Sequence, residues 1–523
     1  MQTTPIQLQS YLCDQWQTGN GEVEELYNPS TENLIATTCT TGLDFDAAFD
    51  HARTVGGPAL RAMTFAERGA LLTKMAAVLH EKREYLLEVS RDCNGATRGD
   101  SKFDVDGATM TLSTYGRYGA KMGDQKFQVD GQASKIAANA RHVGQHFRLP
   151  REGVAFHINA FNFPAWGAFE KIACAFLAGV PVVTKPSSTT ALLTYEMIKI
   201  IVEADFLPKG TLSFIAGDSA DAIENLQAQD VVAFTGSATT AAKLRQSTGV
   251  LHKSVRFNAE ADSLNAAVLG PDVSVGNDIW YRFLNNVVTD ITQKAGQKCT
   301  ASRRIFVPEG LLEAVKEALV ERLEGIVVGY PTDRDVDMGP VVSAKQLADV
   351  RSGIDALAEH GSILIGGSAP VNGKNAPEGK GYFVAPTVIV ANDADSDIFH
   401  QREVFGPVTT ILPYDGTVER ALALVARGEG CLVSSLYTND RKWLKEALLK
   451  AAVWNGRLFV VSAKVADSAL TPSTVLANQN HGGPGRAGGG LELGGTRGLD
   501  LYTNLVAIQG DRALLGKLLG LTL

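Results

Sequence analysis

The stretch GVAFHINAFNFPAWGAFEKIACAFLAGVPVVTKP, residues 153–186, decides the fold class. A short run of apolar residues, a longer apolar pattern with helical spacing, and a second short apolar run follow one another in it. Residues 188–204, STTALLTYEMIKIIVEA, add another helical pattern before the runs TLSFIAG at 211–217 and DVVAFTG at 230–236. Such alternation is typical of a parallel β-sheet with crossover helices. The sequence therefore predicts an α/β domain in this region.

A second alternation of short apolar runs and helical patterns extends from NAAVLG at 265–270 to VTTILPYD at 408–415, which predicts a second α/β domain. Residues 45–91 have apolar residues at helical spacing, with Thr64 as a helix N-cap. The glycine-rich segment NHGGPGRAGGGLELGGTRG, residues 480–498, indicates a loop or linker.

Composition excludes several classes of function. The chain has 523 residues, too many for one ordinary domain, and its 49 basic and 57 acidic residues leave a net charge of -8 without a long basic run. This balance argues against nucleic acid or an anionic membrane as the main partner. The sequence shows neither a signal peptide nor an uninterrupted apolar stretch of membrane-spanning length, so we expect neither export nor membrane insertion.

The cysteines indicate a reducing compartment, and we expect a cytoplasmic protein. They are widely spread and form no CxxC pair, so we predict no metal site and no disulfide framework: Cys13, Cys39, Cys93, Cys174, Cys299 and Cys431.

Three polar residues stand where catalysis could take place. Cys299 lies in QKAGQKCTASRR, residues 293–304, and is either a buried apolar filler or a nucleophile. Asn162 follows a predicted strand in NAFNFP, where a helix cap is more common than an oxyanion donor. Glu260 joins the two α/β regions and suits a structural hydrogen-bond hub as well as it suits a general base.

Three further fragments suit a nucleotide as well as they suit ordinary structure. Lys185, after a predicted strand, is either a solvated lysine or a cation for a ribose or phosphate. Gly236 and Ser237 form a turn into a helix, whose positive end could bind a pyrophosphate, although no GxGxxG motif is present. Glu403 and Phe405 lie in EVFGP, and their ordinary structural interpretation is an acid at a helix end beside an aromatic residue of the core.

The order of these motifs from Asn162 to Phe405 resembles the NAD(P)-dependent aldehyde dehydrogenase superfamily, and the resemblance extends from YNPSTENLIATT at 27–38 to the C-terminal region. It implies an aldehyde dehydrogenase-like α/β fold of two parallel-sheet domains with a small β oligomerisation flap. Such flaps join subunits in relatives, which implies a homodimer. The implied segments are a cofactor-binding domain at 1–135 and 151–263, the first part of the flap at 136–150, a catalytic domain at 264–475, and a return to the cofactor domain and oligomerisation element at 476–523.

The resemblance also implies roles for the catalytic candidates. Cys299 matches the nucleophile that attacks the aldehyde carbon, and Asn162 matches the oxyanion donor. Glu260 matches the base that activates water to release the acid, and Phe163 would line the aldehyde tunnel.

The resemblance further implies which residues contact the cofactor. Lys185 and Ser187 match contacts to the adenosine ribose, Gly236 and Ser237 match the turn at the pyrophosphate, and Glu403 matches the acid that holds the nicotinamide ribose with Phe405 as its apolar neighbour.

Some positions depart from the family pattern. Ser188 stands where NAD-preferring relatives have an acid, so NADP is the expected cofactor and NAD remains possible. The usual ELGG is EADS at 260–263, the second glycine after TGS is Ala241, and the usual HGGxKxSG is HGGPGRAGG at 481–489.

The motifs NAFNFP, NAEADSLN and GQKCTASRR resemble the branch that oxidises coenzyme A thioester semialdehydes in aerobic benzoate degradation. A small-molecule substrate linked to coenzyme A is therefore expected. A CoA-acylating enzyme is an alternative, which Glu260 disfavours because acylating relatives generally lack a base there. The sequence also leaves open a general aliphatic aldehyde dehydrogenase and an inert structural homologue.

Overall fold

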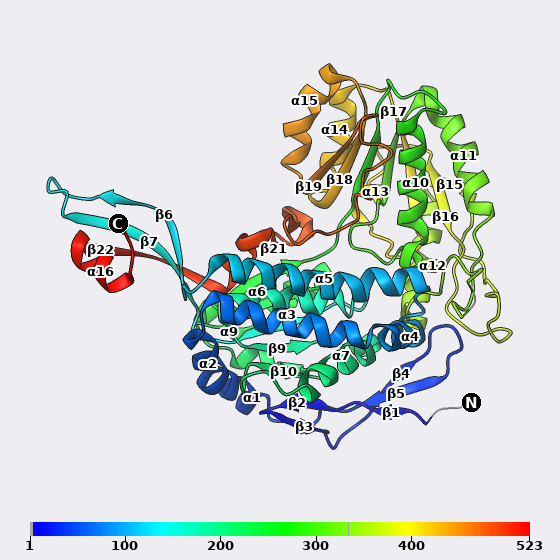
Figure 1. The fold of residues 1–523 in the computed structure, drawn as a ribbon. Coiled ribbons are helices and arrows are strands. Elements are labelled where there is room, and N and C mark those ends of the chain that lie inside the picture. Colours follow the sequence, from blue (N-terminus) through cyan, green and yellow to red (C-terminus); the bar gives the residue numbers. More distant parts are fainter. Residues whose placement is uncertain (1–3, 333, 523) are drawn as a thin grey trace.

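The computed structural model describes residues 4–332 and 334–522, except for the side chains of residues 220 and 221. Figure 1 shows two lobes and a narrow β-sheet that projects to one side. Each lobe is built on a seven-stranded sheet. The predicted α/β architecture with two largely parallel sheets is confirmed.

The lower lobe in Figure 1, which we call the cofactor lobe after its predicted role, contains the sheet predicted from residues 153–236. The five strands from β12 to β10 are parallel, and β2 and β3 extend the sheet beyond β10 in the antiparallel sense. The strand order is β12 (Arg256–Glu260), β11 (Val231–Thr235), β8 (Ala155–Ile158), β9 (Val182–Lys185), β10 (Leu212–Phe214), β2 (Ser10–Leu12) and β3 (Gln15–Gln17).

Helices cover both faces of this sheet because neighbouring strand residues point to opposite sides. Ala155 and Val182 belong to one apolar cluster, whereas Phe156 and Val183 belong to another. The first cluster includes residues of α3 (Phe65–Glu81), α4 (Arg83–Asn94), α5 (Arg98–Met122), α6 (Trp166–Ala178) and α7 (Ala191–Glu203). The second includes residues of α1 (Phe45–His51) and α8 (Ala238–Arg245), while α2 (Gly57–Ala62) and α9 (Thr248–Lys253) are also part of this lobe.

The predicted cap at Thr64 is confirmed. Its hydroxyl accepts a hydrogen bond from the Glu67 amide at 3.2 Å, and the Glu67 carboxylate accepts one from the Thr64 amide at 2.7 Å. This reciprocal capping box satisfies two backbone donors at the start of α3.

The upper lobe, which we call the catalytic lobe after its predicted role, repeats this architecture. Its strands are parallel except for β15, and their order is β15 (Gly361–Ile365), β16 (Thr387–Ala391), β17 (Val408–Tyr414), β14 (Arg304–Pro308), β13 (Ala266–Leu269), β18 (Cys431–Tyr437) and β19 (Asn455–Val461). One face packs against α10 (Asp278–Thr292) and α11 (Leu312–Glu324), and the other against α12 (Ala344–Ala358), α14 (Val418–Ala426) and α15 (Arg441–Ala452), with the short α13 at Ile398–Gln401.

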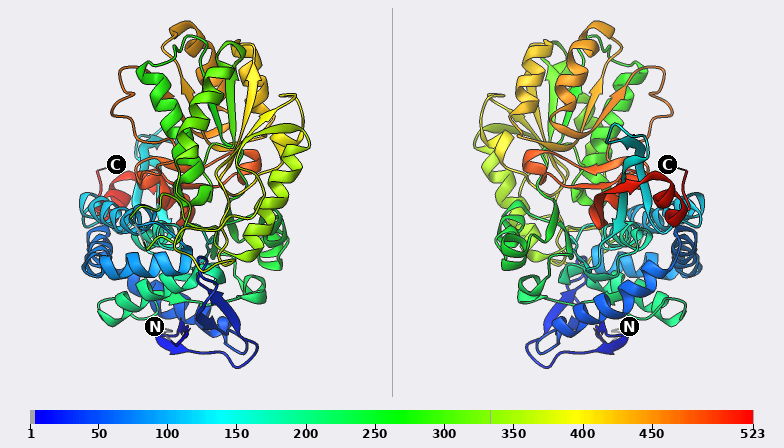
Figure 2. Two further views of the ribbon diagram at one scale, coloured as in Figure 1. Left: turned by 90° about the vertical axis from the view of Figure 1, so that its right-hand side faces the viewer. Right: turned by 90° about the vertical axis from the view of Figure 1, so that its left-hand side faces the viewer.

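The projecting sheet joins segments that are far apart in the sequence. β7 (His142–Pro150) pairs with β6 (Gln128–Lys135) and with β22 (Thr503–Asp511), and α16 (Arg512–Leu519) follows β22. Figure 2 shows the C-terminal segment in red beside the cyan strands. The sheet thus includes residues of the predicted segments 1–135, 136–150 and 476–523, whose boundaries remain a prediction.

A smaller sheet lies near the N-terminus, with β5 (Leu34–Thr38) between β1 (Ile6–Gln7) and β4 (Glu24–Tyr27). None of the helices within residues 4–332 and 334–522 has the length and apolar character needed to cross a membrane.

The glycine-rich segment is more ordered than the sequence predicts. Within residues 480–498, β20 (Asn480–Gly482) and β21 (Leu491–Leu493) form an antiparallel pair, so the interpretation as a simple loop or linker is wrong. The turn between the strands packs on the end of β12: a Cβ added at Gly488 would lie 2.3 Å from the Ala259 carbonyl oxygen. Glycine is therefore required for a close approach to the strand that ends in Glu260.

Candidate active site

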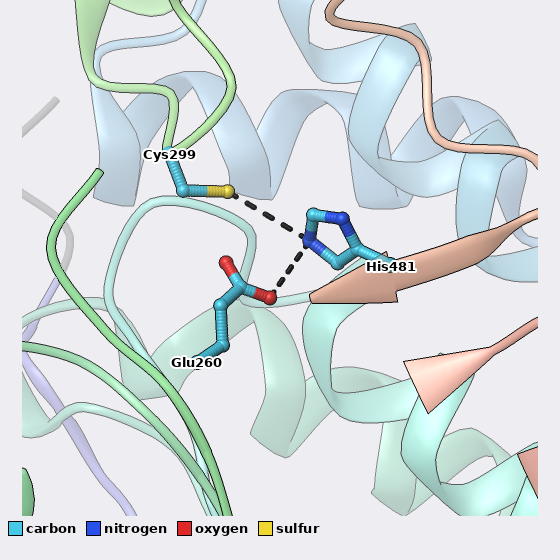
Figure 3. Close-up of side chains that lie close together, drawn as sticks. All are labelled: Glu260, Cys299 and His481. Carbon is cyan, nitrogen blue, oxygen red and sulfur yellow. Dashed lines mark hydrogen bonds and ion pairs between the residues drawn. The ribbon is translucent and has the colours of Figure 1, made fainter. Parts of the chain in front are cut away.

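A pocket near the carboxyl ends of the cofactor-lobe strands brings together the predicted catalytic residues. Its lining includes Asn162, Phe163, Glu260 and Cys299, together with His481 from the glycine-rich segment. Ligand sites in open α/β sheets favour this edge. Figure 3 shows the side chains of Cys299, Glu260 and His481 pointing toward one another.

A strained turn positions Cys299 between α10 and β14. Lys294, Ala295 and Gly296 all have positive φ, at 55°, 50° and 67°, a conformation that is unfavourable for residues other than glycine. Arg303 holds this turn, because its guanidinium donates to the Gly296 carbonyl at 2.8 Å and to the Lys298 carbonyl at 3.1 Å.

Lys298, which precedes Cys299 in the chain, points away from the pocket. Its ammonium lies 2.9 Å from the Asp290 carboxylate, and both side chains are buried.

Cys299 is a thiol in this arrangement. Burial raises the pKa of Cys299 well above its usual value, and the negative charge of Glu260 raises it further. The sulfur lies 3.9 Å from His481 Nε2. Because the thiolate is the attacking species, a neighbouring group must take the proton when the aldehyde is attacked.

Glu260 and His481 form a buried pair, with Oε2 and Nε2 2.7 Å apart. Burial raises the pKa of Glu260, but the charge and hydrogen bond of His481 and the charge of Lys171 outweigh it and lower the pKa to about 2. Burial lowers the pKa of His481, but Glu260 raises it above the ordinary value. Each partner therefore shifts the other toward its charged form, a carboxylate for Glu260 and an imidazolium for His481. Glu260 Oε1 is buried with no hydrogen-bond partner among the described residues, so it can accept a proton from water or from the thiol.

These three side chains form a compact cluster, whose potential ligand atoms all lie within 4.8 Å of one another among the described residues. Within it, the Glu260–His481 contact of 2.7 Å is a hydrogen-bonded ion pair.

Asn162 does not cap the helix that follows it. Asp104 does so, because its carboxylate accepts a hydrogen bond from the Trp166 amide at 2.7 Å. Asn162 Nδ2 instead donates to the Gln297 carbonyl at 3.0 Å. A side-chain amide has two N–H donors, so the second remains for an oxyanion in the pocket.

Aromatic rings narrow the pocket. Phe163 lies edge-to-face against Phe103, with centroids 5.8 Å apart, and against Trp166 at 6.2 Å. The free volume beside Cys299 is about 40 Å³, which is room for about three water molecules. Only a slender group can reach the sulfur.

A second cluster of buried charges adjoins the pocket, with Glu170 and Lys171 in the pocket lining, and it was missed by sequence reasoning. Lys171 Nζ lies 3.3 Å from Glu492 Oε2 and 3.6 Å from Glu170 Oε1. Burial raises the pKa of Glu170 to about 7, although Lys171 acts in the opposite direction. The sequence did contain a signal for this cluster, because Glu170 and Lys171 are adjacent charged residues in the otherwise apolar helix α6. His481 was missed because its segment was interpreted as a linker.

The structure brings the predicted nucleotide residues of the cofactor lobe to one edge of its sheet. Lys185 ends β9, while Gly236 follows β11, and β8 lies between these strands. Burial lowers the pKa of Lys185. Ser187 and Ser188 are half-buried and directly follow this strand.

The start of α8 already attracts an anion. Ser237 Oγ accepts from the Thr240 amide at 3.2 Å, and the Asp262 carboxylate accepts from the Ala238 amide at 2.9 Å. Asp262 belongs to the EADS segment that replaces the usual ELGG. A carboxylate thus bonds an amide of the helix end that the sequence predicted for pyrophosphate.

Glu403 has the properties of a sugar ligand. Its Oε2 accepts from the Ser263 amide at 3.2 Å, whereas its Oε1 is buried without a hydrogen-bond partner in the part of the chain that the structure describes. Burial raises the pKa of Glu403 to about 7. Phe405 lies beneath the Arg303 guanidinium, 5.3 Å from the ring centroid. The unsatisfied oxygen fits a ribose hydroxyl, so the donor and acceptor set fits a nicotinamide dinucleotide.

The fold and site define a class of protein, a two-lobed oxidoreductase with a cysteine between its domains. The sequence pattern of the aldehyde dehydrogenase family matches residues 16–508, and the chain belongs to that family. It is an enzyme that acts on aldehydes and uses NAD(P), so the predicted family and enzyme class are confirmed.

Individual relatives agree with this assignment. The chain is 40% identical over 480 residues to 3,4-dehydroadipyl-CoA semialdehyde dehydrogenase of Aromatoleum evansii, covering 92% of this chain and 93% of that protein. It is 27% identical to a putative aldehyde dehydrogenase from Burkholderia cenocepacia, with a TM-score of 0.84 over 97% of this chain and 98% of that one. An NAD+ complex of aldehyde dehydrogenase from Bacillus cereus matches with 26% identity and a TM-score of 0.82, over 97% and 96% of the two chains.

Proposed function

We propose that the protein oxidises a coenzyme A thioester semialdehyde, such as 3,4-dehydroadipyl-CoA semialdehyde, to the corresponding carboxylic acid with NADP in aerobic benzoate degradation. The observation that carries this proposal is the convergence of Cys299, Glu260 and Asn162 on one narrow pocket. The 40% identity to the Aromatoleum evansii protein supports the substrate class.

The first step is attack of the Cys299 sulfur on the aldehyde carbon, which forms a C–S bond while Glu260 takes the thiol proton. The carbonyl oxygen becomes an oxyanion, which the Asn162 amide and the Cys299 backbone N–H stabilise. Each well-placed donor is worth on the order of 3 kcal/mol. When bound, NADP supplies the hydride acceptor that oxidises the thiohemiacetal to a thioester.

The second step is hydrolysis. Glu260 first passes the thiol proton to solvent. It then accepts a proton from water as the water oxygen attacks the thioester carbon and the C–S bond breaks. This second proton passes to the released sulfur and restores the Cys299 thiol. The balance is aldehyde, water and NADP⁺ giving carboxylic acid, NADPH and a proton.

Two variants test the catalytic roles. Glu260→Gln should form NADPH in a single burst that is slower than in the wild type, because the base that takes the thiol proton is lost, and then stall. The acyl group should stay on Cys299 and be detectable by mass spectrometry. Cys299→Ser should abolish the burst. Cys13→Ser is the matched control, because Cys13 is also half-buried, and it should keep full activity. Unchanged turnover of Glu260→Gln would contradict the assigned role.

The same assay separates hydrolysis from CoA acylation. Added coenzyme A should leave the acid as the product of the wild type, because Glu260 lies in the pocket beside the sulfur. Formation of a new acyl-CoA in place of the acid would identify the acylating alternative.

NADP preference rests on Ser188. We expect a higher kcat/KM with NADP than with NAD, and Ser188→Glu should reverse the ranking because a carboxylate repels a 2′-phosphate and can bind a 2′-hydroxyl. A clear preference of the wild type for NAD would refute this part of the proposal.

We also propose a homodimer in the cytoplasm. The projecting sheet supports dimerisation, because Leu505 on β22 and Leu514 and Leu518 on α16 are exposed apolar side chains. Light scattering after size-exclusion chromatography should give twice the mass of the chain, and Leu514→Asp should lower it. A monomer for the wild type would exclude this assembly.

A further inference from the structure

A large cavity with a cationic lining lies at the amino end of α5. Its volume is about 790 Å³, and it is lined by residues of α4, by the start of α5, and by Pro331, Thr332, Arg334, Val336 and Asp337. Its lining includes four basic side chains, Arg91, Arg98, Lys102 and Arg334, and two acidic ones, Glu88 and Asp337. An anion is therefore the favoured occupant.

Two of the four cations have a counter-ion, and two have none among the described residues. The Arg91 guanidinium is paired with Asp92 at 2.8 Å, and Arg98 with Glu84 at 2.6 Å. No ion pair within 4.0 Å involves Lys102 or Arg334 in residues 4–332 and 334–522, and both side chains are exposed. These two charges are free to bind phosphate oxygens without first breaking a salt bridge to a described residue.

The backbone adds to this positive charge. Thr97 is the N-cap of α5, a helix of 25 residues, and Thr97, Arg98 and Gly99 all line the cavity. The positive end of a long helix thus faces the same space as the free cations. Helix N-termini of this kind bind phosphate groups through their unpaired N–H donors.

The same helix leads from the cavity to the catalytic pocket. Gly99 lines the cavity and Phe103 lines the pocket that contains Cys299. These two residues are four apart and lie on one face of α5. From Thr97 to Phe103 the helix rises about 9 Å.

The narrow pocket explains why a second site is needed. The space beside Cys299 is about 40 Å³, which is far too small for a nucleotide. A coenzyme A substrate must therefore leave its phosphorylated end outside while its acyl end reaches the sulfur. The pantetheine arm between them is an uncharged amide chain, so it needs no charged partner along its path.

We propose that this cavity binds the phosphate groups of the coenzyme A part of the substrate, with Lys102 and Arg334 as their main side-chain ligands. The inference rests on the proposed function. It identifies a nucleotide site separate from the cofactor residues at Lys185 and Gly236, which lie at the carboxyl edge of the cofactor-lobe sheet.

The test compares a substrate that carries coenzyme A, whose phosphates the cavity would hold, with an aldehyde that lacks coenzyme A. The wild type, Lys102→Ala, Arg334→Ala and the double variant are assayed with 6-oxohexanoyl-CoA and with hexanal. Loss of a hydrogen bond to a charged group should raise KM for 6-oxohexanoyl-CoA about tenfold for each cation. The kcat values and all constants for hexanal should not change, which also shows that the variants fold.

Lys209→Ala is the matched control. Lys209 is exposed like Lys102 but precedes β10, away from the cavity lining. It should leave both substrates unaffected.

Desulfo-coenzyme A provides a second measurement. It should inhibit competitively against 6-oxohexanoyl-CoA and not against NADP, and the double variant should weaken the inhibition. Competition with NADP would overturn the inference, because the nucleotide would then occupy the cofactor site.

The two proposals fail differently. If the wild type turns over 6-oxohexanoyl-CoA no more efficiently than hexanal, the proposed substrate class fails and the cavity site fails with it. If the wild type prefers the CoA substrate but the double variant keeps the same preference, the cavity inference alone is wrong.

Discussion

Replacement of His481 should change the pH dependence of hydrolysis. In the wild type, His481 lies 2.7 Å from Glu260 and lowers the pKa of that carboxyl to about 2 against the effect of burial. In His481→Phe both the positive charge and the hydrogen bond are lost. The pKa of Glu260 should then rise toward the value of about 7 that burial gives Glu403 and Glu170.

The expected kinetic consequence follows from the need for a carboxylate base. Glu260 of the wild type stays ionised through the whole working range of pH. In His481→Phe the deacylation rate should be half-maximal near pH 7 and fall about tenfold for each pH unit below it. His481→Gln keeps a hydrogen-bond donor and loses the charge, so its midpoint should lie between those of the other two proteins.

Single-turnover measurements resolve this effect. The acyl-enzyme is formed with excess NADP, and its decay is followed by quenched-flow mass spectrometry from about pH 5 to about pH 9. An acid limb at the same pH in the wild type and in His481→Phe would refute the claim that His481 keeps Glu260 ionised.

Three further predictions concern stability. Glu403→Gln should raise the melting temperature at pH 8. Burial raises the Glu403 pKa from 4.5 to about 7, so ionisation of this carboxyl in the folded state lowers stability by on the order of 3 kcal/mol as the pH rises through this interval. The gain should vanish below pH 4.5, and an equal gain at pH 4 would contradict this cause. Thr64→Ala should lower the unfolding free energy by about 1 kcal/mol through loss of the α3 cap, and unchanged denaturant unfolding would show that the cap contributes nothing. Lys298→Met should cost about 3–5 kcal/mol because it leaves Asp290 buried without its cation, as measured by thermal unfolding, and a melting temperature equal to that of the wild type would refute this.

Several features of the site were predictable because they depend on local patterns. Alternating strand and helix periodicities predicted both sheets. The motif order from Asn162 to Phe405 then indicated the family, and the pocket contains the three predicted catalytic side chains.

Other features depend on contacts between segments that are far apart in the chain. Asn162 looked like a cap for α6, but Asp104, which is 62 residues before the capped Trp166 amide, takes that role. The glycine content of residues 480–498 suggested a linker, whereas close packing against β12 makes the segment a hairpin that carries His481 to Glu260.

The sequence by itself thus determined the elements, their order and the residue types available for chemistry, because hydrophobic periodicity and turn propensity act over a few neighbouring residues. Only the tertiary structure decided which charges meet. The Glu260–His481 pair, the Lys171–Glu492 pair and the cationic cavity at α5 each join residues from separate elements. Their distances are set by how helices and hairpins pack on the sheet edges, and that packing has no local signature in the chain.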